Sequence, residues 1–190
     1  MSESRLSEVQ WLRGGMYGAI AFIAGVALTV MLLYFDHMGT LMQVEINSFV
    51  QVFGLSVAIF YEVQSAFPTR YLWDFGTQRG WLITPVYYAV PLVIVLLISS
   101  VFVYFEAEAS DRVGALLSGA SLAVGYVVLS LVLVALLYSV GALSELNQMH
   151  TNLESPVTFA RVAALGILYP AIVGGIGGVL ANEARNFTED

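Results

Sequence analysis

The sequence predicts an all-α integral membrane protein: a bundle of four transmembrane helices with one short interfacial or re-entrant helix. Of the 190 residues, 58% are hydrophobic and only 11% are charged, whereas a soluble domain usually carries about a quarter charged residues. Four stretches lack Asp, Glu, Lys, Arg and His, and each is long enough to cross a ~30 Å hydrocarbon core as a helix of about 20 residues. They are residues 14–35, 80–105, 113–144 and 162–182.

From these stretches we expect one membrane domain over residues 1–190. None of them alternates polar and apolar residues as a transmembrane strand would, and lipid cannot satisfy free backbone groups, so each must be a helix. The predicted spans are residues 14–35, 81–105, 113–140 and 157–181.

Charge and cysteine content exclude several classes of function. The net charge of −7 comes from fourteen carboxylates against seven arginines, and the chain has no lysine. Such a chain repels nucleic acid, so we expect no nucleic-acid partner. Adaptation to high salt explains the composition, because salt screens surface charge; an ordinary acidic protein is the alternative. Without cysteine, disulfides and thiolate sites are excluded, and no motif indicates a cofactor.

The first span is expected to be permanent. Its uncharged segment, residues 14–35, is longer than the ~7–15 residues of a signal-peptide core, and no small-x-small cleavage pattern stands before Asp36. We therefore favour a membrane helix over a cleavable signal peptide.

A shorter apolar segment lies between the first two spans. The sixteen uncharged residues from Ile46 to Tyr61 would cover only ~24 Å as a helix, less than the hydrocarbon thickness. Small and polar residues recur along one side of the segment at helical spacing. We predict an interfacial or re-entrant helix over residues 46–65; the alternative is a fifth span across a locally thinned bilayer.

An aromatic segment with two arginines follows this helix. Aromatic rings prefer the membrane boundary, and arginine stacks on them or extends toward the headgroups. We predict an interfacial belt rather than an aromatic ligand-binding box. Its anchors are Arg70, Trp73, Arg79 and Trp81.

Prolines mark the start and the middle of two spans. Pro85 falls in the first turn of the second span, and Ser155-Pro156 is a helix-start signal for the fourth, because proline is tolerated at the first helical position. Pro91 and Pro170 fall within these spans and are candidates for kinks or gates.

Small residues recur at a spacing of four, three and four in the first and third spans, and the fourth continues it. Such residues let helix backbones approach closely, which is a main source of association energy in lipid. We predict packing within the chain; a homo-oligomer seam or a contact with another membrane protein is the alternative. The predicted helix-packing residues are Gly14, Gly18, Ala21, Gly25, Gly114, Ser118, Ser121, Gly125, Ala171, Gly175 and Gly178.

Ionisable residues are almost absent from the spans, which argues against a proton pump or an ion-coupled carrier. His37 and His150 have no metal-ligand spacing, and no nucleophile, phosphate loop or dinucleotide motif occurs. We expect a non-enzymatic structural or accessory subunit embedded in the lipid bilayer, with no catalytic, cofactor or metal site. A small facilitator or channel-like transporter without ion coupling is the alternative.

Arginine placement predicts a cytoplasmic N-terminus in the cytoplasmic membrane, because cytoplasmic flanks carry the excess of positive charge. Four arginines then lie inside and two outside, while Arg161 lies at an outer helix boundary. A five-span arrangement gives the same balance. The inner arginines are Arg5, Arg13, Arg112 and Arg185, and the outer ones are Arg70 and Arg79.

Two glycine-rich stretches carry a resemblance to a known group of proteins. Together with the aromatic segment and the lysine-free acidic chain, residues 114–126 (GALLSGASLAVGY) and 168–181 (LYPAIVGGIGGVLA) resemble a family of small haloarchaeal membrane proteins. That family is uncharacterised, and some members carry a loose transporter label. The resemblance implies a source and a fold type, and it carries over no functional residue.

Overall fold

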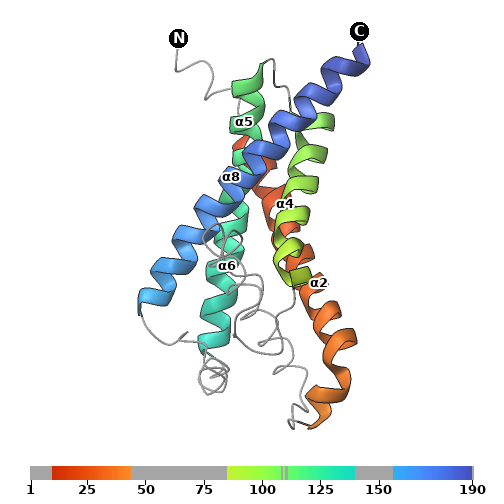
Figure 1. The fold of residues 1–190 in the computed structure, drawn as a ribbon. Helices are drawn as coiled ribbons and strands as arrows, with labels where there is room; N and C mark the ends of the chain where they lie inside the picture. The colour runs from red at the N-terminus through yellow and green to blue at the C-terminus, as the bar shows by residue number, and fades with distance from the viewer. Residues whose placement is uncertain (1–9, 44–84, 108, 110, 140–155, 190) are drawn as a thin grey trace.

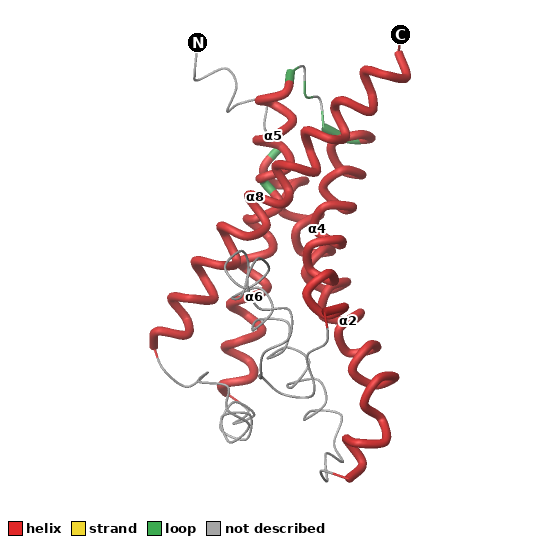
Figure 2. The backbone as a smooth tube through the Cα atoms, viewed as in Figure 1, coloured by secondary structure: helices red, strands yellow, loops and turns green. Residues whose placement is uncertain are grey.

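The computed structural model describes residues 10–43, 85–107, 109, 111–139 and 156–189. Within these ranges every regular element is an α-helix (Figures 1 and 2). The predicted helix at 46–65 lies outside the described residues. The helices are α2 (Trp11–Gln43), α4 (Pro85–Phe105), α5 (Arg112–Ala120), α6 (Leu122–Ser139) and α8 (Pro156–Glu189).

The helices form one elongated bundle. α8 packs on α4, α5 and α6, and α2 packs on α4 and α6. The end of α4, the start of α5 and the end of α8 lie together at the top of Figure 1. Lower in that view, the start of α8 and the end of α2 diverge to opposite sides of the bundle.

Among the described residues, three helical segments are long and apolar enough to cross a membrane: Trp11–Leu32, Arg112–Leu133 and Gly166–Thr188. Ala89–Phe105 is a shorter apolar helix. Large apolar side chains face outward on every helix, as expected for a surface in contact with hydrocarbon. They include Ile20, Ile23, Val101, Leu116, Val128, Ile172 and Leu180.

The core combines apolar side chains with hydroxyl groups. Phe102, Val103 and Leu122 are fully buried, and the Phe22 ring meets the Tyr126 ring edge-on at 5.2 Å. Thr29 is 1% exposed and donates its hydroxyl to the Gly25 carbonyl oxygen at 2.9 Å, so this polar group is satisfied within its own helix.

The helix bounds differ from the sequence expectation in two respects. α2 continues beyond residue 35 to Gln43, and α8 continues beyond residue 181 to Glu189. The expected third span, 113–140, consists of two helices that meet at Ser121. A count of uncharged residues locates the apolar part of a helix. It detects neither a polar extension of that helix nor an interruption inside the apolar run.

The prolines lie where helices begin or inside them. Pro85 and Pro156 are the first residues of α4 and α8. Pro91 and Pro170 are buried inside those helices, and neither helix ends there. Their role as kinks or gates stays a prediction.

Candidate functional site

The first of three close helix contacts joins α2 to α6. A Cβ atom added to Gly18 would overlap the carbonyl oxygen of Leu122, and one added to Gly125 would overlap the carbonyl oxygen of Gly15. A Cβ atom at Gly15 itself would lie 3.6 Å from the Gly125 nitrogen, at ordinary van der Waals distance. The helix backbones therefore touch at positions where no side chain fits.

The second contact joins α5 to α8. A Cβ atom at Gly174 would lie 2.5 Å from the Gly119 carbonyl oxygen, and one at Gly119 would overlap the Gly174 carbonyl oxygen. One at Gly178 would overlap the carbonyl oxygen of Ala115. Gly119 and Gly174 thus face each other reciprocally across the two helices.

The third contact joins α4 to α8 and adds side-chain hydrogen bonds. The Ser100 hydroxyl lies 3.0 Å from the Gly177 carbonyl oxygen and 2.8 Å from the Leu96 carbonyl oxygen. Ser99 is fully buried and donates to Leu96 at 2.9 Å. A Cβ atom at Gly177 would overlap the Ser99 hydroxyl, so this glycine makes room for the serine pair.

The α2–α6 and α5–α8 contacts share one geometry. A carbonyl oxygen of one helix points at the Cα hydrogen of a glycine on the next, which is the arrangement of Cα–H···O contacts, each worth about 0.5–1 kcal/mol. Lipid gives apolar helices little hydrophobic reason to associate, so close packing and such contacts carry the association energy.

The predicted packing residues divide between contact positions and other sites. Gly14, Gly18, Ser121, Gly125, Gly175 and Gly178 each lie at a helix contact, where Gly14 meets Ser121 and Gly175 meets Leu116. Ala21, Gly25 and Ser118 are buried, and Ala171 is half-buried. The space beside Gly114 is filled by Asp111 and Ala109 of its own loop rather than by another helix.

Four glycines at the contacts were not among the predicted residues. They fall outside the four-three-four spacing used for the prediction, although each is a glycine inside an apolar run. Glycine in such a run is itself the more general signal. The four are Gly15, Gly119, Gly174 and Gly177.

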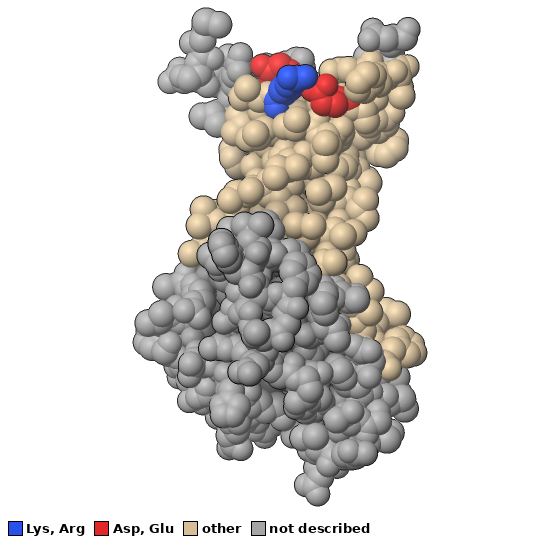
Figure 3. Space-filling model, in the orientation of Figure 1, with Lys and Arg blue, Asp and Glu red and all other residues tan. Residues whose placement is uncertain are grey.

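Charged residues gather at one end of the bundle, which we call the charged end. On the face drawn in Figure 3, the coloured charged groups lie at the top, and the described surface directly below them is uncharged. Asp111 caps α5 there by accepting a hydrogen bond from the Gly114 amide at 2.7 Å. The charged end comprises Arg13, Glu106, Asp111, Arg112, Glu183 and Arg185.

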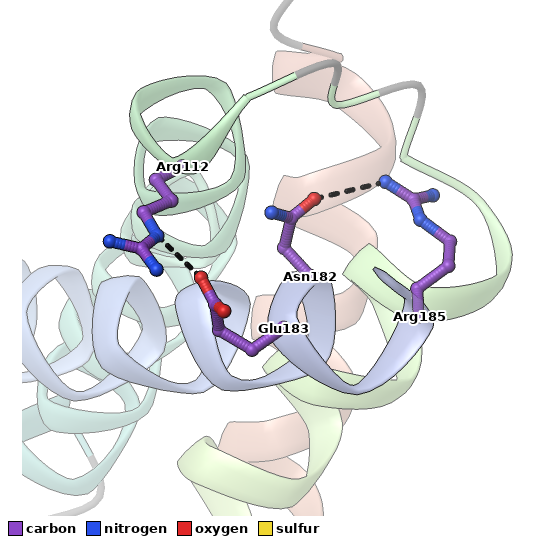
Figure 4. Close-up of polar contacts among 4 residues, drawn as sticks. All are labelled: Arg112, Asn182, Glu183 and Arg185. Carbon is purple, nitrogen blue, oxygen red and sulfur yellow. Dashed lines mark hydrogen bonds and ion pairs between the residues drawn. The ribbon is translucent and has the colours of Figure 1, made fainter. Parts of the chain in front are cut away.

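Arg185 holds the turn after α4 against α8. Its guanidinium donates to the carbonyl oxygen of Ala109 at 2.7 Å and to that of Ala107 at 3.3 Å. It also donates to the side chain of Asn182 at 3.3 Å (Figure 4). Asn182 is only 4% exposed. Ala107 and Ala109 lie in the turn beyond α4, where part-buried backbone carbonyl groups need hydrogen-bond donors, so an arginine from a neighbouring helix is well suited to this position.

Two further polar contacts complete the charged end. Arg112 at the start of α5 pairs with Glu183 of α8 at 2.5 Å (Figure 4). Tyr17 donates its hydroxyl to Glu106 at 2.5 Å, while its ring lies 5.0 Å from the Phe102 ring. Each helix that reaches this end is therefore joined to another by a polar side chain.

Within the described part of the chain, no group of three or more His, Asp or Glu side chains could hold a metal ion. The predicted interfacial anchors Arg70, Trp73, Arg79 and Trp81 lie outside the described residues.

Comparison with known proteins gives one match. A family model described as a family of unknown function (DUF7978) matches residues 1–185. Neither a curated protein nor a solved structure matches the chain.

Proposed function

The chain belongs to the DUF7978 family of unknown function, and we propose that it is a non-enzymatic structural or accessory subunit of the cytoplasmic membrane. The observation that carries the proposal is the set of glycine contacts. α2 meets α6 and α5 meets α8 backbone to backbone, and α4 meets α8 through the Ser99 and Ser100 hydroxyls at Gly177. An interior filled in this way suits a scaffold better than a path for solutes.

Four membrane spans fit the helix lengths. The 21 residues of α4 would extend about 32 Å at 1.5 Å per residue, which matches a hydrocarbon core of about 30 Å. α5 and α6 together supply one further crossing, and α2 and α8 supply one each. The other end of each helix would then lie at the opposite membrane face.

The charged end is assigned to the cytoplasmic side. Arg13, Arg112 and Arg185 gather there from three different helices, in line with the excess of positive charge on cytoplasmic flanks. The N-terminus would be cytoplasmic in this orientation. The acidic, lysine-free composition supports a source that lives in high salt.

A facilitator without ion coupling is the second candidate. It is favoured by Pro91 and Pro170, which are buried in the contacting helices α4 and α8. A path between these helices would have to separate Ser100 from the Gly177 carbonyl oxygen that it binds.

Single-cysteine variants separate the two candidates, since the natural chain has no cysteine. Ser99→Cys tests the α4–α8 contact, Leu97→Cys is a control that faces outward on the same helix, and Arg112→Cys is a control at the charged end. A charged, water-soluble thiol reagent should modify Arg112→Cys alone in proteoliposomes. Reaction at Ser99→Cys, slowed by a transported solute, would contradict the scaffold and favour the facilitator.

The accessory role has its own test. Purified from native membranes at molar salt, the protein should migrate as a homo-oligomer or with another membrane protein in fixed stoichiometry. A strict monomer with no retained partner would contradict this role, whatever the labelling experiment gives.

A further inference from the structure

At Ser121 the third membrane segment changes the helix that it contacts most closely, although α6 also packs on α8. Before this residue, α5 contacts α8 through Gly119 and Ala115. After it, α6 contacts α2 through Leu122 and Gly125. The chain therefore passes from one closely packed helix pair, α5–α8, into another, α2–α6.

The backbone at Ser121 departs from regular α-helical hydrogen bonding. The Ser121 amide is shared between the carbonyl oxygens of Leu117 at 3.0 Å and Ser118 at 3.2 Å. The Val124 amide binds the Ser121 carbonyl oxygen at 3.2 Å, three residues back instead of four. Such a tightened turn inside a helix is common at hinges.

The Ser121 side chain stabilises this turn. Its hydroxyl donates to the Ser118 carbonyl oxygen at 2.6 Å, a bond that bends helices, and the residue is fully buried. Gly14 of α2 lies against the hydroxyl, where a Cβ atom would overlap it. Hydrocarbon contains no water to bind backbone groups where a helix is interrupted. The Ser121 hydroxyl supplies a hydrogen bond at this point from within the chain.

We propose that Ser121 is a pivot about which the α2–α6 pair rocks relative to the α5–α8 pair. Backbone-to-backbone contacts fix each pair, because two backbones in contact cannot slide without collision. α4 moves with α8, to which Ser100 binds it.

The contacts between the two pairs are looser than the contacts within each pair. α2 meets α4 through the Tyr17 and Phe102 rings, at 5.0 Å, and the Tyr17 hydroxyl binds the exposed Glu106 side chain just after α4. α6 meets α8 near Val127, where a Cβ atom at Gly166 would lie 3.3 Å away instead of overlapping. Small sliding movements of packed helices, with rotation at a few hinge residues, are an established form of conformational change.

Distances between spin labels in lipid nanodiscs test the pivot, using the cysteine-free chain as background. All label sites are outward-facing. Labels at Val113 and Ile172 report the α5–α8 pair, and labels at Ile23 and Leu136 report the α2–α6 pair. Labels at Val113 and Leu136 report the distance across Ser121.

The proposal predicts one narrow distance within each pair and a broad or two-peaked distribution across Ser121. Ser121→Ala, which removes the bond to Ser118, should narrow the distribution across Ser121 and leave both within-pair distances unchanged. Ser118→Ala is the matched control, because it removes a buried hydroxyl one turn away and keeps the carbonyl oxygen that Ser121 binds.

Two results would overturn the pivot. One is a distribution across Ser121 that is as narrow as the within-pair distances. The other is an equal effect of Ser118→Ala and Ser121→Ala. Circular dichroism of each labelled protein shows whether its helices are intact, and Ser121→Thr, which keeps a hydroxyl, should behave as the natural protein if Ser121→Ala fails to fold.

Discussion

In the middle of the bundle the helices touch through backbone atoms, whereas at the charged end long polar side chains join them. The middle holds Gly119 against Gly174 with no side chain between them. At the charged end, Arg185 reaches across to the carbonyl oxygens of Ala107 and Ala109. The proposed membrane setting explains the difference: hydrocarbon favours close approach of small residues, while the membrane boundary tolerates charge.

This comparison ranks the effects of substitutions. In the middle, an added atom has nowhere to go, so the smallest side chain should be disruptive. At the charged end, water can hydrate groups that lose a partner. The loss of stability should therefore be smaller where the residues of the lost contact are more exposed.

The largest effect is expected for Gly125→Ala, which would press a methyl group into the Gly15 carbonyl oxygen. Overpacking of this kind costs about 1–3 kcal/mol. Gly15→Ala is the matched control on the same contact, because its Cβ atom would lie 3.6 Å from the nearest atom of α6. Unfolding in mixed detergent, followed by circular dichroism, measures both. Equal stability of the two variants would refute the backbone contact between α2 and α6.

Arg185→Ala should have the next largest effect. It removes the donor that binds Ala107, Ala109 and Asn182 and leaves part-buried carbonyl groups without it. The free energy of unfolding should fall by about 1–3 kcal/mol. Arg185→Lys keeps the charge but not the planar fork, and should restore only part of the stability. If both variants unfold at the temperature of the natural protein, Arg185 does not hold the turn.

Tyr17→Phe should have a smaller effect than Arg185→Ala. It removes the hydrogen bond to Glu106 and keeps the ring beside Phe102. Glu106 is exposed, so water can hydrate the carboxylate after the bond is lost. The melting temperature should fall slightly, and Phe102→Ala, which removes a fully buried ring, should lower it far more. A larger fall in melting temperature for Tyr17→Phe than for Phe102→Ala would mean that the hydrogen bond to Glu106 stabilises the protein more than the buried ring does.

Arg112→Gln should have the smallest effect, and one that depends on salt. The Arg112 side chain is 75% exposed, and exposed ion pairs contribute little and are screened by salt. Melting temperatures of this variant and the natural protein should differ slightly at low ionic strength and coincide at molar salt. A difference that persists at molar salt would show that the pair is shielded from solvent.

The sequence was most informative about which parts of the chain are apolar helix. The long uncharged stretches of the sequence coincide with parts of α2, α4, α6 and α8. The positions of Pro85 and Pro156 indicate where two helices begin. These predictions work because the hydrocarbon thickness and the chemistry of proline act locally. Membership of an uncharacterised family is also shown, by the match over residues 1–185.

The spacing of residues along the chain does not predict which helices pack against each other. The interruption at Ser121 depends on partners on both sides, and nothing in the uncharged run 113–144 signals it. Gly119 and Gly174 were missed because the tilt of two helices, and not a fixed spacing, decides which glycines meet. The Arg185 contact joins residues 76 and 78 positions apart, and no sequence spacing indicates it.

In the proposed arrangement the outward-facing apolar surface lies in hydrocarbon, with the charged end at the membrane face. Single spin labels at Ile20, Val128, Ile172 and Arg112, in reconstituted bilayers, test it through collisions with oxygen and with a water-soluble nickel complex. We expect collisions with oxygen to dominate at the three apolar positions and collisions with the nickel complex to dominate at Arg112. Strong nickel contact at Val128 or Ile172 would contradict it.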